Sequence, residues 1–261
     1  MDDGRFHTHT HFPSTFLDNR RTLTVWLPPG YDDELDARYP VLYLHDGQNV
    51  FDADRAAFGV SWDAHTTAAR LIHAGRIRPV ILVGIDHAAR DDEYAVHRDT
   101  SEMAGGRGAL YARFVLDEVK PFLDANYRTL ADRRHTGVIG ASMGGLISLS
   151  MARLHPQRFA LCGVLSPSLW WGRCKELHEA ADGGSWLKRM RFWLDMGTRE
   201  GKRGRHVTAG IEQARQLVSC FDAAELRPGR DYYYWEVAGG EHNEAAWAAR
   251  FDKLLLFFLG L

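Results

Sequence analysis

The sequence predicts an α/β fold with a mostly parallel central sheet that helices cover on both faces. Two observations support this fold class. Short apolar runs of strand length alternate along the chain with longer segments whose apolar residues recur at helical spacing, the order typical of a parallel sheet. The chain has 261 residues, 45% of them hydrophobic, which is enough for one sizeable domain with a full core. We therefore expect residues 1–261 to form a single domain.

The first two strands are expected to form the antiparallel part of this sheet, because short polar connections join them. Residues Phe6–Phe12 and Arg21–Leu27 both show the alternating pattern of a strand. His7, His9 and His11 fall on one face of the first strand, at a spacing that could hold a metal ion. No carboxylate cluster accompanies them, so we interpret this segment as an exposed edge strand and expect no metal site.

The rest of the chain alternates between predicted strands and predicted helices. Strands are expected at Val41–Leu44, Val80–Ile85, Thr136–Ile139, Phe159–Leu165, Arg191–Met196 and Asp231–Val237. Helices are expected at Ser61–Ala74, Ala109–Ala125, Gly145–Leu154, Gly210–Leu226 and Ala245–Leu259, with a loop or short helix at Gly172–Gly184. Pro121 should bend the helix that contains it or mark a boundary there.

The overall charge and the cysteines narrow the class of protein. A net charge of −2 gives no electrostatic reason to expect binding to nucleic acid or to an anionic membrane surface. The chain has no apolar run near the roughly 20 residues of a membrane span. We interpret its polar N-terminus as something other than a secretory signal, and a mature chain from which a signal has been removed is the alternative. The three cysteines are scattered and odd in number, which favours reduced thiols in the cytoplasm. The sequence leaves the oligomeric state open.

Gly140-Ala141-Ser142-Met143-Gly144 stands between a predicted strand and a predicted helix, which is the context of a nucleophile elbow. A serine at such a sharp turn needs neighbours without bulk, and Gly140 and Gly144 meet that need. The turn exposes the Ser142 hydroxyl and aims the Met143 N–H at a developing oxyanion. An ordinary serine in a glycine-rich turn is the alternative, but the flanking elements favour catalysis.

A serine hydroxyl needs a base, and the base needs a carboxylate that holds its tautomer. In this architecture the order is serine, acid, histidine, each in a loop after a strand. His242 follows the last predicted strand, although it could also be an ordinary histidine at the start of a surface helix. Glu200 lies just beyond the strand Arg191–Met196 and is the favoured acid, with Asp195, inside that strand, as the alternative.

The loop after the strand Val41–Leu44 should supply the second oxyanion donor. It reads His45-Asp46-Gly47-Gln48-Asn49, and Gly47 lets the backbone come close, so the Gln48 N–H is the candidate, with Gly47 next. A simple glycine turn is the alternative. This chemistry needs no cofactor, and the sequence contains neither a P-loop nor a G-x-G-x-x-G fingerprint.

Three stretches, Leu42–Asn49, Gly137–Gly145 and Ser166-Pro167-Ser168-Leu169-Trp170-Trp171, together resemble the "putative esterase" family of α/β-hydrolases. The resemblance runs from about Arg20 to the end of the chain. The family, which is related to esterase D, includes feruloyl and acetyl-xylan esterases, enterochelin-type siderophore esterases, S-formylglutathione hydrolase and the mycolyltransferases. The Ser-Pro-Ser-Leu-Trp-Trp stretch and residues 197–201 are more specific to this branch than the elbow is, and they support Ser142, Glu200 and His242 as its triad.

The resemblance implies an α/β-hydrolase fold and a carboxylesterase that acts on small acyl, aryl or siderophore-type esters. An acyltransferase with the same triad, or a binding protein without catalysis, is the alternative. Trp170 and Trp171 are candidates for an aromatic or acyl pocket, but adjacent side chains point in different directions, so at most one should face it. Relatives often carry Arg-x-x-Glu-Tyr-x-Pro, whereas residues 90–96 lack the proline, and we expect that loop to border the substrate pocket.

Overall fold

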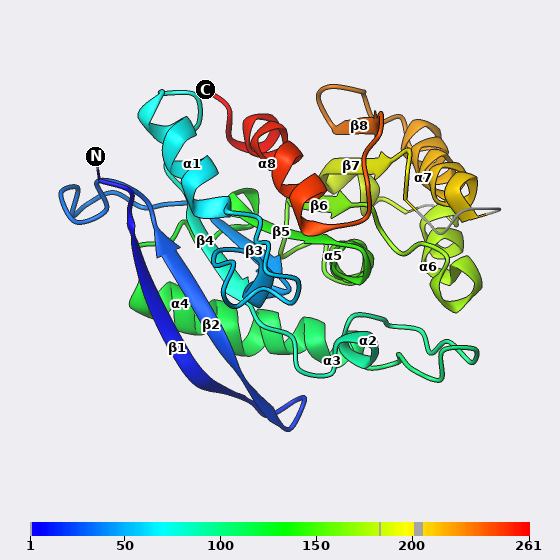
Figure 1. Ribbon diagram of the computed structural model, residues 1–261, viewed down its shortest axis with the longest axis horizontal. Coiled ribbons are helices and arrows are strands. Elements are labelled where there is room, and N and C mark those ends of the chain that lie inside the picture. The colour runs from blue at the N-terminus through cyan, green and yellow to red at the C-terminus, as the bar shows by residue number, and fades with distance from the viewer. Residues whose placement is uncertain (1, 183, 201–205) are drawn as a thin grey trace.

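The computed structural model describes residues 2–182, 184–200 and 206–261, and the sheet is its central element (Figure 1). Eight strands are hydrogen-bonded in the order β1-β2-β4-β3-β5-β6-β7-β8. The strands are β1 (Arg5–Ser14), β2 (Asn19–Leu27), β3 (Val41–His45), β4 (Ile81–Ile85), β5 (Thr136–Ala141), β6 (Leu161–Leu165), β7 (Arg191–Gly197) and β8 (Tyr232–Val237).

The pairing follows the sequence prediction. β1 is antiparallel to β2, and β2 is antiparallel to β4, whereas all pairs from β4 to β8 are parallel. Every residue of β3, β4, β5 and β6 is buried, as expected for parallel strands that helices cover on both faces. The parallel sheet therefore brings the loops after β3, β5, β7 and β8 to one edge.

Helices cover the two faces of the sheet, and Figure 1 shows α1 and α8 on one side with α4 and α5 on the other. The α-helices are α1 (Ala64–His73), α2 (Arg90–Glu93), α3 (Gly108–Arg113), α4 (Lys120–Asn126), α5 (Met143–Leu154), α6 (Trp171–Ala181), α7 (His206–Ala223) and α8 (Glu244–Leu259). None of the helices in the described ranges is both long and apolar enough to cross a membrane.

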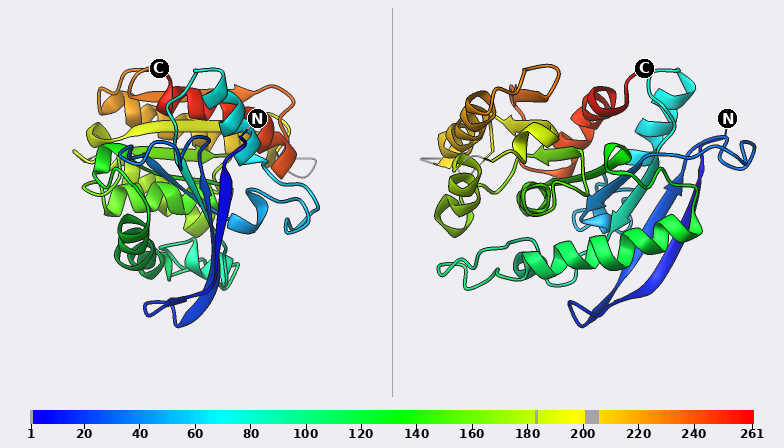
Figure 2. Two further views of the ribbon diagram at one scale, coloured as in Figure 1. Left: turned by 90° about the vertical axis from the view of Figure 1, so that its left-hand side faces the viewer. Right: turned by 180° about the vertical axis from the view of Figure 1, so that it is seen from behind.

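The predicted helix at 109–125 is one continuous helical rod of three segments. A π-helical turn, Phe114–Val119, joins α3 to α4, and Pro121 stands in the first turn of α4. Next to Pro121 the rod changes from π-helical to α-helical hydrogen bonding, so the predicted boundary is a change of helix type within a rod that continues through the proline. Figure 2 shows this rod alongside the β1–β2 hairpin, whose tip projects past the rest of the molecule.

The prediction that three histidines share one face of β1 is wrong. The register of β1 against β2 shifts between His9 and Phe12, and His11 has a left-handed φ of 58°. A bulge of this kind turns the following side chain off the face on which it would otherwise lie. Only His7 and His9 remain together, and both contact the hydroxyl of Tyr127, at 3.2 and 2.7 Å.

Candidate active site

Ser142 occupies a strained turn between β5 and α5. Its φ of 58° and ψ of −122° lie in a region that residues other than glycine rarely adopt. A Cβ atom at Gly140 would lie 2.5 Å from the backbone carbonyl group of Gly144, so this close approach of strand and helix requires glycine. The Ser142 N–H donates to the Leu165 carbonyl at 3.0 Å, and the Ser168 N–H donates to the Ser142 carbonyl at 3.1 Å. The end of β6 therefore fixes the turn.

Three side chains from separate strand ends form a hydrogen-bonded series at this edge of the sheet. The Oγ of Ser142 lies 2.9 Å from Nε2 of His242, which follows β8. The other ring nitrogen, Nδ1, lies 2.9 Å from Oε2 of Glu200, which follows β7. The structure thus brings together the serine, the histidine and the favoured acid of the sequence prediction.

Glu200 is buried, and hydrogen bonds hold the carboxylate oxygen that does not contact His242. Its Oε1 accepts hydrogen bonds from the Gly197 N–H at 2.6 Å and from the Ser166 hydroxyl at 2.5 Å. Arg250 of α8 adds a charged contact at 3.4 Å. A Cβ at Gly197 would lie 2.6 Å from this carboxylate, so the turn after β7 has room for Glu200 only because residue 197 is glycine.

Asp195, the alternative acid, points elsewhere. Its carboxylate accepts from Nε1 of Trp193 at 2.6 Å and pairs with Arg250 at 2.8 Å. The side chain is fully buried, and this burial raises its pKa to about 6 although Arg250 favours the carboxylate. Asp195 is therefore a buried partner of Arg250, and Glu200 is the acid that contacts the histidine.

The loop that carries Gln48 packs against the first turn of α5. A Cβ at Gly144 would lie 3.3 Å from both Oδ2 of Asp46 and Cβ of His45. A Cβ at Gly47 would meet the backbone of Ile85 at 2.6 Å, so the loop also presses on β4. The Gln48 side chain contacts the His87 ring, which leaves its backbone N–H as the group it could offer to a substrate.

Arg90 binds Asp46, the residue at the turn of this loop, through two hydrogen bonds. Its Nε and Nη2 donate to the two carboxylate oxygens of Asp46, both at 2.8 Å, and the Asp46 N–H donates to the Tyr94 hydroxyl at 2.9 Å. Burial alone would raise the pKa of the Asp46 carboxyl, but the bonds and charge of Arg90, with His87, lower it to about 2. Asp46 has a left-handed φ of 56°, so these hydrogen bonds hold a strained backbone.

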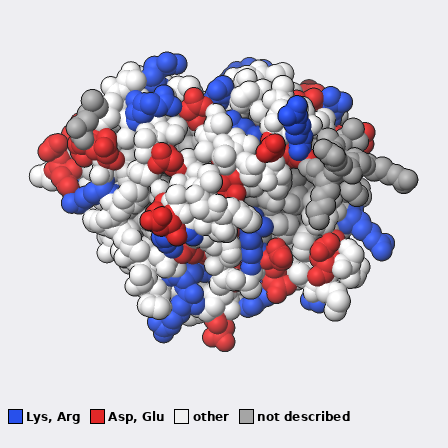
Figure 3. Space-filling view, in the orientation of Figure 1, with Lys and Arg blue, Asp and Glu red and all other residues white. Residues whose placement is uncertain are grey.

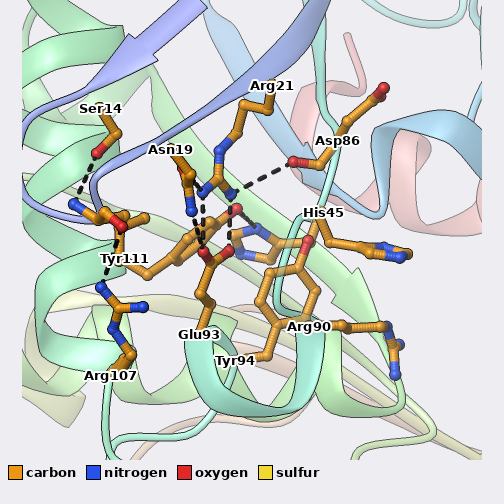
Figure 4. A network of polar contacts seen from close by, with 12 residues as sticks. Ser14, Asn19, Arg21, His45, Asp86, Arg90, Glu93, Tyr94, Arg107 and Tyr111 are labelled. Carbon is orange, nitrogen blue, oxygen red and sulfur yellow. Dashed lines mark hydrogen bonds and ion pairs between the residues drawn. The ribbon is translucent and has the colours of Figure 1, made fainter.

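The expectation that residues 90–96 border the substrate pocket is wrong. Figure 4 shows Glu93 and Tyr94 inside a polar network, whereas the Arg90 side chain is directed away from Glu93, and its partner is Asp46. Glu93 is fully buried and pairs with Arg21 of β2 at 2.9 Å. These three side chains therefore hold the hairpin and the Gln48 loop in place, because each has its partner inside the protein.

A pocket of about 760 Å³ opens beside Ser142 and His242. Trp170 and Met196 give it an apolar wall, and Trp170 keeps 48% of its surface exposed. Trp171, which was expected as a second candidate for this pocket, is only 5% exposed and donates from Nε1 to the His97 carbonyl at 2.9 Å. The prediction that Trp171 binds substrate is therefore wrong, because its side chain packs inside the protein while that of the adjacent Trp170 faces the pocket.

Sequence reasoning missed three polar residues around the series. Ser168 lies 3.3 Å from the Ser142 hydroxyl, and the Ser166 hydroxyl joins Glu200 to Trp247 and Arg250 of α8. Both serines directly follow β6, at the same edge of the sheet, so the strand-end argument could have found them. No sequence signal marks Arg250, which is an ordinary helical position.

His97, Glu176 and Glu179 form the one group of potential metal ligands that lie close together in the described parts of the chain. Arg153 reaches into this group and donates to Glu176 at 2.7 Å and to Glu179 at 2.5 Å. The guanidinium supplies the positive charge that a cation would bring, so the arrangement is an ion-pair cluster. Figure 3 shows acidic and basic side chains interspersed over the visible face.

Comparison with known proteins identifies the class. The model of the family described as "Putative esterase" matches residues 14–258, nearly the whole chain. The chain belongs to this family, and it is an ester-hydrolysing enzyme.

Individual relatives are distant but cover much of the chain. The Bacillus subtilis (strain 168) protein YbbA, itself uncharacterized, is 27% identical over 211 residues, which are 77% of this chain and 78% of the relative. The iron(III) salmochelin esterase of Escherichia coli O6:H1 is 29% identical over 261 residues, 90% of this chain and 57% of the relative. An IroE-like serine hydrolase from Shewanella oneidensis superposes with a TM-score of 0.77 at 18% identity, covering 96% of this chain and 79% of that one. Such likenesses establish the α/β-hydrolase fold.

Proposed function

We propose that this enzyme is a serine carboxylesterase that cleaves small-molecule esters through an acyl-enzyme on Ser142. The observation that carries the proposal is the hydrogen-bonded series Ser142–His242–Glu200 beside an open pocket. The series has the order and the spacing that nucleophilic catalysis by serine requires, since nucleophile and base, and base and acid, are each 2.9 Å apart.

In the first half-reaction Ser142 Oγ attacks the ester carbonyl carbon while His242 Nε2 takes the hydroxyl proton. Glu200 keeps the other ring nitrogen protonated and stabilises the imidazolium that forms. The backbone N–H groups of Met143 and Gln48 donate to the carbonyl oxygen as it becomes an oxyanion. When the tetrahedral intermediate collapses, the C–O bond of the ester breaks and the imidazolium gives its proton to the departing alcohol.

In the second half-reaction water releases the acid. His242 has 39% of its side chain exposed, so solvent reaches the base directly. The imidazole takes a proton from water as the hydroxide oxygen attacks the acyl carbon, and it returns that proton to Ser142 Oγ as the acyl–serine bond breaks. The enzyme regains its starting state, and one ester and one water have become one acid and one alcohol.

The pocket supports an acyl group with an apolar or aromatic part. Trp170 offers a half-exposed indole face and Met196 a flexible thioether, both of which suit a ring or a short alkyl chain. Small acyl, aryl and siderophore-type esters are the substrate classes that we propose. The names of relatives agree with this range, since they include a salmochelin esterase and a ferulic acid esterase.

Hydrolysis of p-nitrophenyl esters from acetate to octanoate tests the proposal. Wild type should hydrolyse at least the short members, and Ser142→Ala should lower kcat/KM by about 10³-fold or more with unchanged circular dichroism. Turnover by Ser142→Ala equal to that of wild type would exclude the mechanism. Products analysed with added alcohol acceptors separate hydrolysis from acyl transfer.

A further inference from the structure

His242 has a second hollow beside it. A depression of about 360 Å³, which shares only His242 with the Trp170 pocket, is lined by Phe58, Val60 and residues 242–245. Phe58 is 79% exposed and Val60 is 42% exposed. Because burial of such groups is favourable, two exposed apolar side chains that line one hollow with the histidine offer surface that a ligand could cover. These two are therefore available to a ligand.

The chain fixes the position of these two side chains. Gly59 stands between them with a left-handed φ of 67°, and its N–H donates to the Ala56 carbonyl at 3.1 Å, which closes a turn. Asn49 holds the base of this loop, because its Oδ1 accepts from the Ala57 N–H at 3.1 Å and its Nδ2 donates to Glu244 at 3.1 Å. The loop is thus tied to the first turn of α8, directly after His242.

The side chains of Asn243 and Glu244, which line this hollow, already have hydrogen-bond partners. Asn243 caps α8 by accepting from the Ala246 N–H at 2.9 Å, and its Nδ2 donates to Glu241 at 3.1 Å. Glu244 is buried and bonded to Asn49. The surface that remains for a ligand is chiefly that of Phe58 and Val60, so it suits an apolar group better than a polyhydroxylated one.

The chemistry of ester cleavage gives the two hollows different roles. The acyl group becomes bonded to Ser142, whereas the alcohol oxygen must receive its proton from His242 Nε2. Ser142 and His242 both line the Trp170 pocket, but the second hollow contains His242 without Ser142. A group that reaches the histidine and extends away from the serine therefore belongs to the alcohol half of the substrate.

We propose that Phe58 and Val60 form an alcohol subsite and that the enzyme prefers esters of apolar, in particular aromatic, alcohols. This inference rests on the proposed function and adds the second half of the substrate. Val60 also lines a larger open groove with Phe6 and Phe51, so the two hollows meet at this side chain. Alcohols longer than a benzyl group are therefore expected to extend past Val60 towards that groove.

Esters with one acyl group and different alcohols test the subsite. We would measure kcat/KM for methyl, benzyl and octyl butyrate with wild type, the double variant Phe58→Ala/Val60→Ala, and Leu35→Ala. Leu35 is a matched control, because it is 73% exposed and lines neither hollow. The ratio of kcat/KM for benzyl over methyl butyrate should fall about tenfold in the double variant and stay at the wild-type value in Leu35→Ala.

The step at which the loss occurs gives a second readout. The alcohol has left before water attacks, so the double variant should slow formation of the butyryl-enzyme and not its breakdown. A benzyl-to-methyl ratio equal to that of wild type, or an equal loss with all three esters, would overturn the subsite. Failure of the proposed function would look different, because no ester would then show turnover that depends on Ser142.

Discussion

Replacing Asp195 with Asn tests which of two buried carboxylates serves the histidine. Both contact the Arg250 guanidinium, but only Glu200 bonds to His242, at 2.9 Å. Asp195→Asn should keep kcat/KM within about tenfold of wild type. Glu200→Gln should lower it by about a thousandfold or more, because an amide neither holds the required tautomer nor stabilises the imidazolium.

Substitutions in the cluster of Asp195, Glu200 and Arg250 should also change the free energy of unfolding. Burial raises the pKa of Asp195 to about 6, so the folded protein binds this proton more tightly than the unfolded chain does. That contribution is complete below about pH 4 and declines as the pH rises through about 6. At pH 7.5 Asp195→Asn should therefore cost at most about 1 kcal/mol. Arg250→Met leaves two buried carboxylates without their cation and should cost about 3–5 kcal/mol.

Urea unfolding followed by tryptophan fluorescence, at about pH 5 and pH 7.5, measures these costs, and p-nitrophenyl butyrate hydrolysis measures activity. The cost of Asp195→Asn should be smaller at the higher pH, because only wild type loses stability between the two. The reasoning is refuted if Asp195→Asn loses as much activity as Glu200→Gln while its unfolding midpoint stays near that of wild type. Asp195 would then be the acid that acts on the histidine.

Three further substitutions probe the parts around the series. Arg90→Met should lower the free energy of unfolding by about 2 kcal/mol at pH 7, because Arg90 lowers the pKa of Asp46 to about 2. This loss of stability relative to wild type should shrink as the pH falls from about 4 towards 2, where Asp46 becomes protonated in the folded protein too. An equal loss at pH 7 and pH 2 would contradict this. Gly140→Ala should unfold the protein or lower its thermal midpoint by about 10 °C or more, since the new Cβ would lie 2.5 Å from backbone atoms of Gly144; a wild-type melting curve would contradict this. Trp170→Ala should lower kcat/KM for phenylacetyl esters about tenfold relative to acetyl esters, and an unchanged ratio would remove Trp170 from the acyl pocket.

The sequence predicted three site residues that lie in loops directly after strands. Ser142, Glu200 and His242 each follow a strand that the sequence predicts, and parallel strands bring such ends to one edge. The preference for Glu200 over Asp195 had the same basis, because a residue beyond the strand end is freer to reach into the crevice than one inside it. Local patterns thus predicted the serine, the acid and the histidine that the structure brings together.

Features that depend on long-range packing could not be predicted in this way. The bulge after His9 arises from the pairing of β1 with β2, and alternation in one strand does not reveal it. Arg250 lies on a helix far along the chain, and only the folded structure brings it to Asp195 and Glu200. Residues 90–96 were placed at the pocket from resemblance alone, but within this segment Glu93 pairs with Arg21 of the hairpin and Arg90 pairs with Asp46 of the Gln48 loop.

Covalent trapping tests the central claim most directly, that Ser142 is the nucleophile activated by His242. Diethyl p-nitrophenyl phosphate should add one diethylphosphoryl group to wild type, and peptide mass spectrometry should locate it on Ser142, with loss of esterase activity in proportion. Ser142→Ala should remain unlabelled, and His242→Ala should be labelled about a thousandfold more slowly. Labelling at another residue, or esterase activity that persists after Ser142 is fully labelled, would contradict the account.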